Sequence, residues 1–272
     1  MAKNILEATF MKDFIKVTHD MWHKGWHERN GGNVSYRLTT EEVDKYVDTN
    51  SGSRSVELFR AIPELSCEVF LVTSAGKYFR NIILDPEENL GIIEIDEMGK
   101  SYRIWWGFLD NGLPTSELPA HLLSHASRMK ATDGQCRVVL HSHTTNLIAL
   151  SNVLKLDTAT FTRTLWQMHT ECIVVFPDGI GVLPWMMPGS DEIGEATAEL
   201  MKTHSLVLWP FHGLFSTGVT LDEAFGLIDT AESAAEIMVK SLAMGGAKQT
   251  ITKSQLLALA TTFGVTPLDG IL

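Results

Sequence analysis

The sequence predicts an α/β fold, in which a single domain is built on a mixed central β-sheet with helices on both faces. Apolar runs typical of strands alternate along the chain with amphipathic segments of helical period. Several neighbouring strands are separated only by short turns, and such hairpins indicate a mixed rather than an all-parallel sheet. The chain has 272 residues and shows no internal repeat, linker or low-complexity tract, so one domain is expected to span residues 1–272.

The first half of the chain begins with a predicted amphipathic helix over residues 4–24, which ends near Gly25. A Gly-Gly turn then leads into a short alternating strand at residues 34–38. Residues 39–60 are polar and aperiodic, and we expect a surface excursion there rather than a domain boundary. Further strands are predicted at residues 67–73, 90–96 and 101–108, the last two as a hairpin.

The second half opens with a predicted helix that starts at Thr115 and ends before Gly134. A β-branched strand is expected at residues 137–143, and a helix at residues 146–154 follows it directly. The apolar run ECIVVF at residues 171–176 is predicted to be a buried strand. The remaining predicted elements are helices at residues 158–168, 190–203, 221–243 and 253–263 and a strand at residues 205–211.

Composition and charge argue against several classes of partner. The formal charge of -11 argues against a nucleic-acid partner, because phosphate backbones attract stripes of Lys and Arg. No apolar run reaches the roughly 18 residues that a membrane span needs, and the N-terminus lacks the apolar centre of a signal peptide. We therefore expect a cytoplasmic protein with neither a nucleic-acid nor a membrane partner. The cysteines form no CxxC pair, which fits a reducing compartment; they are Cys67, Cys136 and Cys172.

Two histidines mark the end of the strand predicted at residues 137–143. In a strand, His141 and His143 point to the same face, so their imidazoles can share one metal ion. A zinc centre with an open position needs a third protein ligand, and the candidate is His212, which ends another apolar strand and is followed by Gly213. Taken separately, these residues would equally fit solvated or core histidines. Together they predict a three-histidine metal site at the end of buried strands, where α/β proteins tend to bind ligands.

Two further histidine pairs have a spacing that can hold a metal ion. His121 and His125 are four residues apart and would share one face of a predicted helix. The same spacing relates His23 and His27. The segment 121–125 lacks the glutamate of an HExxH motif, and neither pair has an obvious third ligand. We interpret both pairs as structural or interfacial residues.

The segment Thr115-Ser116-Glu117 allows two interpretations. Hydroxyl and carboxylate side chains at the start of a helix commonly cap its free N–H groups. The same residues could instead supply a base beside the metal and a helix N-terminus suited to an anion. Spacing alone does not separate the two. Glu171, at the start of the strand predicted over residues 171–176, is by default an exposed edge carboxylate.

Two turns that contain glycine lie next to predicted strands, at residues 30–33 and 73–77. Their backbone N–H groups could hold a phosphate. Neither turn is a Walker loop, since Tyr78 follows Gly76-Lys77 and position 71 is Leu, and no GxGxxG motif opens a strand–helix unit. Each turn alone is a weak signal, because Asn and Gly are frequent in turns of every kind.

In chain order, the motifs GGNVS, TSAGK, TSELPAH, HSH and FHG resemble those of the class II aldolase/adducin family. The likeness covers nearly the whole chain and diverges only around residues 39–66. The resemblance implies a class II aldolase-like fold and, in rhamnose catabolism, a zinc-dependent cleavage of L-rhamnulose 1-phosphate into dihydroxyacetone phosphate and L-lactaldehyde. It also implies a homotetramer with one zinc ion per subunit and an active site near a subunit interface.

The resemblance assigns roles to the residues at matching positions. His141, His143 and His212 match the zinc ligands. Glu117 matches the catalytic acid/base, and Glu171 matches a catalytic carboxylate that a neighbouring subunit contributes. The residues that match contacts to the substrate and its phosphate are Asn30, Gly32, Asn33, Ser74, Gly76, Thr115 and Ser116.

One turn departs from the family pattern. The family often has Thr-Gly-Ser-Gly where this chain has Thr73-Ser74-Ala75-Gly76. A serine hydroxyl is therefore missing at position 75, and Ser74 is the candidate to replace it.

Aldol cleavage leaves a carbanion next to a carbonyl, and either a lysine Schiff base or a divalent metal can stabilise that charge. Lys77 is the only lysine within a candidate motif, so the histidines favour the metal. Another sugar-phosphate enzyme, such as a fuculose-phosphate aldolase or a pentulose-phosphate 4-epimerase, would share these elements. A non-catalytic adducin-type binding module would need neither the three histidines nor Glu117. A metal-dependent hydrolase would release phosphate without forming an aldehyde.

Overall fold

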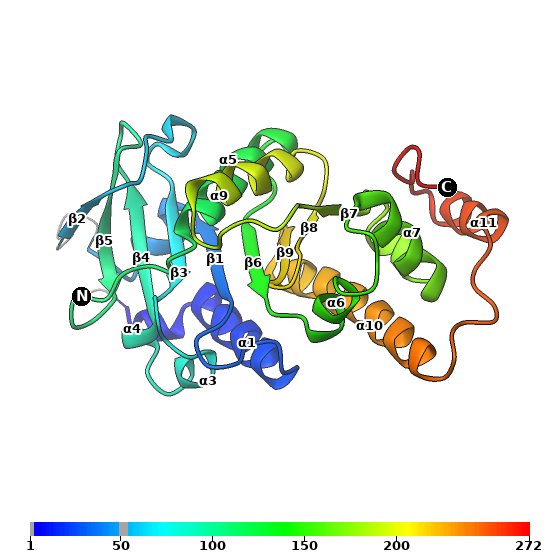
Figure 1. The fold of residues 1–272 in the computed structure, drawn as a ribbon. Coiled ribbons are helices and arrows are strands. Elements are labelled where there is room, and N and C mark those ends of the chain that lie inside the picture. The colour runs from blue at the N-terminus through cyan, green and yellow to red at the C-terminus, as the bar shows by residue number, and fades with distance from the viewer. Residues whose placement is uncertain (1–2, 49–53) are drawn as a thin grey trace.

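Nine strands form one sheet in the computed structural model, which describes residues 3–48 and 54–272. Their order across the sheet is β2-β5-β4-β3-β1-β6-β9-β8-β7 (Figure 1). Neighbouring strands are antiparallel except β7 and β8, which are parallel, so the sheet is mixed as the sequence predicts. The strands are β1 (Asn33–Leu38), β2 (Arg54–Glu57), β3 (Val69–Thr73), β4 (Leu90–Ile95), β5 (Ser101–Gly107), β6 (Val138–Ser142), β7 (Ile180–Val182), β8 (Leu206–Trp209) and β9 (Gly213–Gly218).

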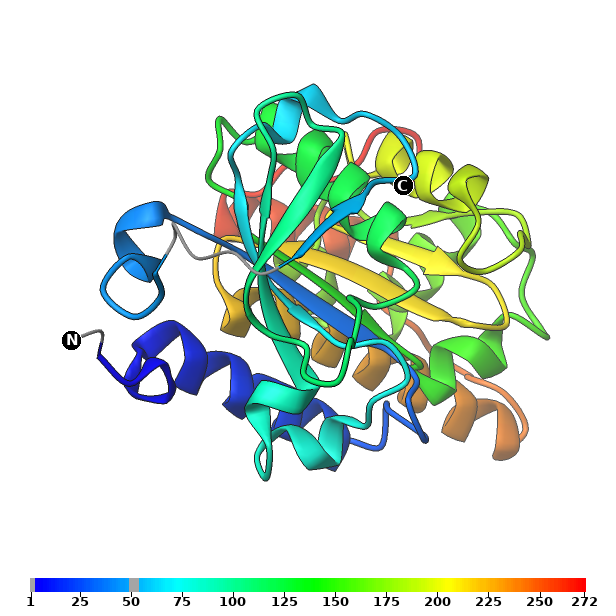
Figure 2. The same ribbon diagram turned by 90° about the vertical axis from the view of Figure 1, so that its left-hand side faces the viewer.

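Helices cover both faces of this sheet (Figures 1 and 2). Helices α5 (Leu118–Ala131) and α9 (Asp191–Leu200) pack against each other on one face, and α1 (Thr9–His23) and α10 (Leu221–Ala243) lie on the other. Among the described residues, no helix is both long and apolar enough to cross a membrane. The other helices are α2 (Thr40–Val43), α3 (Phe79–Ile82), α4 (Pro86–Asn89), α6 (Thr145–Leu150), α7 (Thr158–Met168), α8 (Cys172–Val175) and α11 (Lys253–Phe263), with 3-10 turns at Ile5–Glu7 and Pro63–Leu65.

Strand β3 shows how both faces of the sheet are buried. Every residue of this strand is buried, and alternate side chains join different hydrophobic clusters. Val69 and Leu71 pack into the cluster that includes α1 and α10, whereas Phe70 and Val72 pack into the cluster that includes α5. A sheet with one face in water would alternate apolar with polar residues instead. The predicted fold class is confirmed.

One predicted element is wrong. Residues 171–176 do not form a strand, because Cys172–Val175 form the short helix α8, which packs against α10 and α11. Strand β7 takes the edge position beside β8. A short apolar run fits a buried turn of helix as well as a buried strand, and periodicity does not separate the two.

Residues 39–60 contain more regular structure than the sequence predicts. Thr39 and Glu42 form a capping box at the start of α2. Strand β2 pairs with β5 at the edge of the sheet. Its side chains alternate between half-buried and exposed positions, so its sequence carries no apolar signal. Residues 49–53 of this segment lie outside the described residues.

The sheet brings the sequence motifs together at one end of its central strands. Strand β1 is antiparallel to both β3 and β6, so the turn before β1 lies where β3 and β6 end. Asn33 is paired directly with His141. The segment before α5 joins this group, because the Thr115 N–H donates to the Thr73 carbonyl at 2.9 Å. Segments that are far apart in sequence thus meet at one place.

Candidate active site

The three histidines of the predicted metal site form one cluster. His141 is near the end of β6, His143 follows that strand directly, and His212 is in the turn between β8 and β9. Each offers a ring nitrogen, and these nitrogen atoms all lie within 4.8 Å of one another. The ring centroids are 4.9 Å apart for His141 and His212 and also for His143 and His212.

Two glycines allow this close approach. A Cβ atom on Gly213 would lie 2.3 Å from the Ser142 carbonyl oxygen and 2.9 Å from Cε1 of His141. A Cβ atom on Gly31 would lie 2.6 Å from Nδ1 of His143. Side chains at these positions would push the histidines out of the cluster. Gly213 therefore leaves room for the end of β6 and for His141, and Gly31 in the Gly-Gly turn leaves room for His143.

The protonation of these imidazoles suits a metal ligand. Burial lowers the pKa of His141 well below its usual value, and the nearby His212 and His143 lower it further. Burial and His143 likewise lower the pKa of His212 to about 4, against the opposing effect of Glu28. His141 and His212 are therefore neutral at pH 7, which is the form that binds a metal ion.

Hydrogen bonds orient two of the rings. Nδ1 of His141 lies 3.3 Å from the Leu214 carbonyl oxygen, so this nitrogen donates and Nε2 keeps its lone pair. That Nε2 is buried and has no hydrogen-bond partner among the described residues. Nδ1 of His143 lies 2.8 Å from a carboxylate oxygen of Glu28. Metal-binding histidines commonly donate their second nitrogen in this way, and the residues present fit a zinc ion.

Glu117 lies beside the histidine cluster. Its carboxylate oxygens are 3.6 Å from Nε2 of His141 and 3.7 Å from Nε2 of His212. Asn33 donates a hydrogen bond to the same carboxylate at 2.9 Å. Burial raises the pKa of Glu117, while the Asn33 hydrogen bond and the nearby His143 act in the opposite direction. A carboxyl group whose pKa is raised towards neutrality suits proton transfer.

The structure separates the two interpretations of the segment before α5. Glu117 is the residue that caps α5, yet its side chain makes no capping hydrogen bond. The Thr115 hydroxyl accepts the Glu117 N–H at 3.2 Å. The threonine therefore serves the helix start, and the carboxylate of Glu117 is directed to the histidines.

The turns proposed for phosphate lie around this cluster with different hydrogen-bonding capacity. Ser74 is buried, and its hydroxyl donates to the Leu113 carbonyl at 3.2 Å while its N–H donates to Asn89. Gly76 is exposed at φ +70°, a conformation that favours glycine, and a Cβ there would meet nothing within 4 Å. Asn30 and Ser116 are exposed, Gly32 is half-buried, and Thr115 is buried.

Glu171 does not join this cluster within the chain. It is exposed at the residue preceding α8, and it makes no ion pair or hydrogen bond with the three histidines in the described part of the chain. Helix α8 packs on α7, α10 and α11. The structure thus places Glu171 apart from the other predicted catalytic residue, Glu117.

The surroundings of the other two histidine pairs, His121 with His125 and His23 with His27, indicate a structural role. His121 and His125 are fully buried between α5 and β1, where both contact the Ser35 hydroxyl. His27 is buried, stacks on Phe79 at 4.0 Å between ring centroids and contacts the Gly31 carbonyl at 2.8 Å. His23 is exposed at the end of α1. Neither pair belongs to the group of potential metal ligands found in the described residues.

The comparison with family models matches residues 12–239 to the class II aldolase and adducin N-terminal domain. The chain belongs to the class II aldolase and adducin family. This match covers the histidine cluster, Glu117 and both glycine-containing turns, and it confirms the family inferred from the motifs.

Full-length relatives lie within this family. The chain is 59% identical over 269 residues to a rhamnulose-1-phosphate aldolase from Pectobacterium atrosepticum, which covers 98% of each chain. It is 58% identical over 271 residues to a rhamnulose-1-phosphate aldolase from Mannheimia succiniciproducens, which covers 99% of this chain and 100% of the relative. At this identity over the full length, the protein is placed among the aldolases, which are lyases.

Solved structures agree with the family fold. A sugar-phosphate aldolase from Thermotoga maritima has 30% sequence identity and a TM-score of 0.74, with 87% of this chain and 96% of that chain covered. An L-fuculose 1-phosphate aldolase has 17% identity and a TM-score of 0.60, with 95% of this chain and 97% of that chain covered, and this likeness shows the fold alone.

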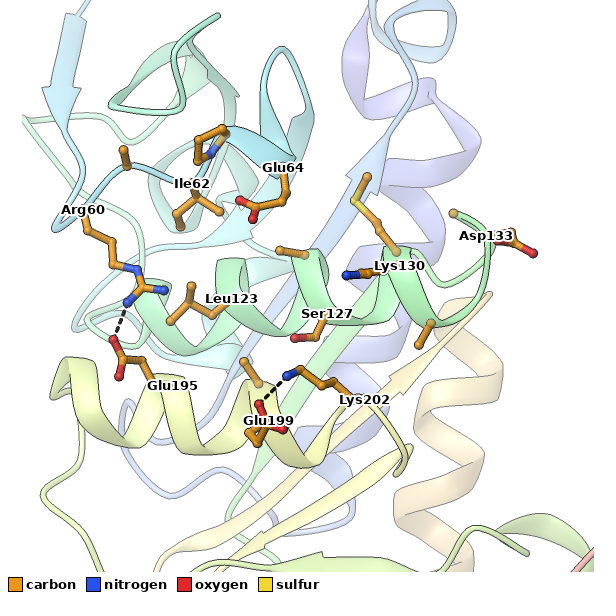
Figure 3. A pocket seen from close by; sticks show the side chains of 17 residues that line it. Arg60, Ile62, Glu64, Leu123, Ser127, Lys130, Asp133, Glu195, Glu199 and Lys202 are labelled. Carbon is orange, nitrogen blue, oxygen red and sulfur yellow. Dashed lines mark hydrogen bonds and ion pairs between the residues drawn. The ribbon is translucent and has the colours of Figure 1, made fainter.

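A cavity of about 1290 Å³ lies beside α5 and α9 (Figure 3). It is lined by α5, α9 and the segment 60–64. Arg60 pairs with Glu195 on α9, and Lys202 pairs with Glu199, three residues before it. It contains none of the residues that the sequence assigns to the site.

Sequence reasoning missed two features of this candidate site. One is Glu28, which orients His143 and lies 115 residues before it. The other is the hydrogen-bonded link from Asn33 to His121 behind Glu117. Both features depend on contacts between distant segments. The only signal in the sequence was the position of Glu28 close to the Gly-Gly turn and the GGNVS motif.

Proposed function

We propose that the protein cleaves L-rhamnulose 1-phosphate into dihydroxyacetone phosphate and L-lactaldehyde. The observation that carries this proposal is the arrangement of three close imidazoles with the Glu117 carboxylate 3.6 Å from one and 3.7 Å from another. The names of the full-length relatives support the choice of substrate. The same arrangement would serve a related sugar phosphate, so the substrate is the finer part of the proposal.

His141, His143 and His212 would hold one zinc ion per subunit. A zinc ion bound there would act as a Lewis acid on the oxygens of the sugar, a contribution of several kcal/mol to lowering the barrier. Glu28 and the Leu214 carbonyl hold two of the rings in the tautomer that leaves the other nitrogen free. The histidines are thereby oriented before the ligand arrives.

Glu117 would move a proton at the carbon that gains negative charge. When the bond between C3 and C4 breaks, its electron pair remains on C3, next to the C2 carbonyl, and C3 must then receive a proton. A buried carboxyl group that Asn33 holds in place can supply and recover this proton. General acid/base catalysis of this kind contributes roughly a hundredfold to ten-thousandfold in rate.

The turns around the cluster would bind the phosphate of the substrate. Gly32, Gly76 and the segment 115–116 present backbone or hydroxyl groups at the end of the sheet where the histidines lie. Turns of this type hold anions through N–H groups without a cationic surface. The acidic chain can therefore bind a small phosphorylated sugar. The residues proposed for these contacts are Asn30, Gly32, Asn33, Ser74, Gly76, Thr115 and Ser116.

Glu171 would act from a neighbouring subunit. Its exposed position, apart from the histidines of its own chain, is compatible with a site completed in a homotetramer. In that assembly Glu171 would handle the proton of the C4 hydroxyl, which is lost as the aldehyde forms. We further propose that residues 1–272 form one catalytic domain and that the enzyme works in the cytoplasm.

The test is a coupled assay of the purified protein with L-rhamnulose 1-phosphate. Dihydroxyacetone phosphate and L-lactaldehyde should form in equal amounts, removal of metal with a chelator should abolish the reaction, and zinc should restore it. L-fuculose 1-phosphate and L-ribulose 5-phosphate, assayed side by side, should react more slowly. Full activity after complete metal removal, or phosphate release without aldehyde, would contradict the proposal.

A further inference from the structure

A continuous chain of buried hydrogen bonds runs from Glu117 into the protein interior. Asn33 donates to the Glu117 carboxylate at 2.9 Å, and its amide oxygen contacts Nε2 of His121. Nδ1 of His121 lies 2.6 Å from the Ser35 hydroxyl, which lies 2.8 Å from Nε2 of His125. All five residues are buried, and both histidines and Ser35 are fully so.

The periods of a helix and a strand produce this chain. Glu117, His121 and His125 are spaced by four residues along the start and first turns of α5, so they share one side of the helix. Asn33 and Ser35 are two residues apart on β1 and point to the same face. The two rows of side chains interleave where α5 crosses β1, and the row on α5 begins at Glu117.

The ionised form of Glu117 fixes the direction of every hydrogen bond in the chain. A carboxylate only accepts, so Asn33 must present its NH₂ group to Glu117 and its oxygen to His121. Nε2 of His121 must then carry a proton, which makes its Nδ1 an acceptor for the Ser35 O–H. The Ser35 oxygen in turn accepts from Nε2–H of His125.

The end of the hydrogen-bond chain that is farthest from Glu117, at His125, agrees with this direction. Nδ1 of His125 is buried and has no partner among the described residues. If Nε2 carries the proton of a neutral ring, this Nδ1 bears only a lone pair, which is a smaller cost than an unpaired N–H. Burial lowers the pKa of His121 to about 3 and that of His125 well below its usual value, so both rings stay neutral.

We propose that His121, oriented by Ser35 and His125, is a positioning residue that holds the Asn33 amide with its NH₂ group towards Glu117. This inference rests on the proposed aldolase function, in which Glu117 moves a proton. An amide does not readily relay a proton, so the chain orients and polarises the carboxylate rather than supplying protons to it. Without the His121 donor, Asn33 can flip and turn its oxygen towards Glu117.

Two substitutions at one position separate positioning from packing. In His121→Gln, the longer amide can place an N–H where Nε2 stood and still donate to Asn33. In His121→Asn, the shorter amide remains near Ser35 and cannot reach Asn33. We expect kcat within about threefold of wild type for His121→Gln and a loss of about tenfold or more for His121→Asn, because small displacements of a reacting group cost large factors in rate.

Three further variants complete the design. Ser35→Ala removes the O–H that donates to Nδ1 of His121 and so supports the tautomer that the Asn33 oxygen requires, and we expect a several-fold loss in kcat. Ser124→Ala removes a buried hydroxyl on α5 that has no hydrogen-bond partner in the described residues, and it should leave kcat unchanged. His204→Gln alters a buried histidine bonded to the Asp178 carbonyl, away from this chain, and should also leave kcat unchanged.

Zinc content and thermal stability are measured for every variant. A readout that needs no substrate is the ¹⁵N spectrum of the imidazoles, in which His121 should be the Nε2–H tautomer in wild type, with that preference weakened in Ser35→Ala. Equal kcat for His121→Gln and His121→Asn, or an Nδ1–H tautomer for wild-type His121, would overturn the proposal. An inactive wild-type enzyme with the expected tautomer would overturn the proposed function instead.

Discussion

Asn33 lies directly opposite His141 in the antiparallel pairing of β1 with β6, and the same Asn33 donates a hydrogen bond to Glu117 at 2.9 Å. One position of the sheet therefore connects a proposed metal ligand with the proposed acid/base. Because strand pairing fixes this relation in the folded chain, the geometry does not depend on the arrival of a ligand. Preorganised groups of this kind need little rearrangement during the reaction.

Replacement of Glu117 by glutamine tests the proton-transfer role. Glutamine keeps an oxygen for the Asn33 amide and nearly the same volume, but it does not take up a proton. We expect kcat to fall by roughly a hundredfold to ten-thousandfold while bound zinc stays unchanged. Steady-state kinetics and metal analysis provide the measurement, with Glu236→Gln on the exposed side of α10 as the control. Near-normal turnover would show that Glu117 has only a structural role at the start of α5.

Replacement of Glu28 by glutamine tests the orientation of His143. The Glu28 carboxylate lies 2.8 Å from Nδ1 of His143, and loss of such a partner typically weakens metal binding about tenfold to a hundredfold. The Glu28 side chain is 69% exposed, so we expect the lower end of this range. Competition with a chromophoric chelator measures the zinc affinity. Glu87→Gln, an exposed carboxylate on α4, should bind zinc as wild type does, and an unchanged affinity for Glu28→Gln would argue against this role.

Local periodicity was sufficient to predict the core of the site. His141 and His143 are two residues apart at the end of a strand, and the period of a strand places them on one face. The position of His212 followed from the same reasoning at a second strand end. These predictions needed only the identity of the strands and the preference of zinc for imidazole ligands.

Contacts between distant segments could not be predicted in this way. Glu28 and His143 are 115 residues apart, and Asn33 and Glu117 are 84 residues apart. Their proximity depends on the strand order and on how α5 crosses β1. A sequence specifies such contacts only through the whole fold.

Strand β9 was not among the elements predicted from the sequence. Its sequence, GLFSTG, contains two glycines and two hydroxyl residues, yet all six residues are buried because β9 lies between β6 and β8. The Ser216 hydroxyl donates to the Ala224 carbonyl at 2.8 Å, which satisfies a polar group in the interior. Buried polar residues with such partners remove the apolar pattern on which strand prediction relies.

Replacement of Gly213 by alanine tests the packing behind the histidines. The added Cβ would lie 2.3 Å from the Ser142 carbonyl oxygen and 2.9 Å from Cε1 of His141, so β6 or the imidazole must move. We expect a destabilisation of about 1–3 kcal/mol and weaker zinc binding. The matched control is Gly226→Ala in α10, where nothing lies within 4 Å and a gain of about 0.5–1 kcal/mol is expected. Urea unfolding and zinc titration give both quantities, and equal behaviour of the two variants would contradict the argument.

Because His27 is buried, we expect the protein to lose stability in mild acid. Burial, with a smaller contribution from the nearby His143, lowers its pKa to about 4 despite the hydrogen bond with the Gly31 carbonyl. The unfolded chain takes up this proton near pH 6.5, so below that value the unfolded state binds more protons than the folded state. The contribution of neutral, buried His27 to the free energy of unfolding is therefore fully present above pH 6.5. It is lost as the pH drops towards 4, by about 3 kcal/mol in total.

His27→Gln isolates this effect, because glutamine is close to histidine in size but does not titrate. We expect wild type to lose about 2 kcal/mol more than His27→Gln between pH 7 and pH 5, as measured by urea unfolding at both values. Comparing the two proteins cancels the titration of the other histidines, including the proposed metal ligands. His23→Gln, on the exposed end of α1, should keep the wild-type pH dependence. If wild type and His27→Gln lose the same free energy, then His27 is not the residue that limits stability in acid.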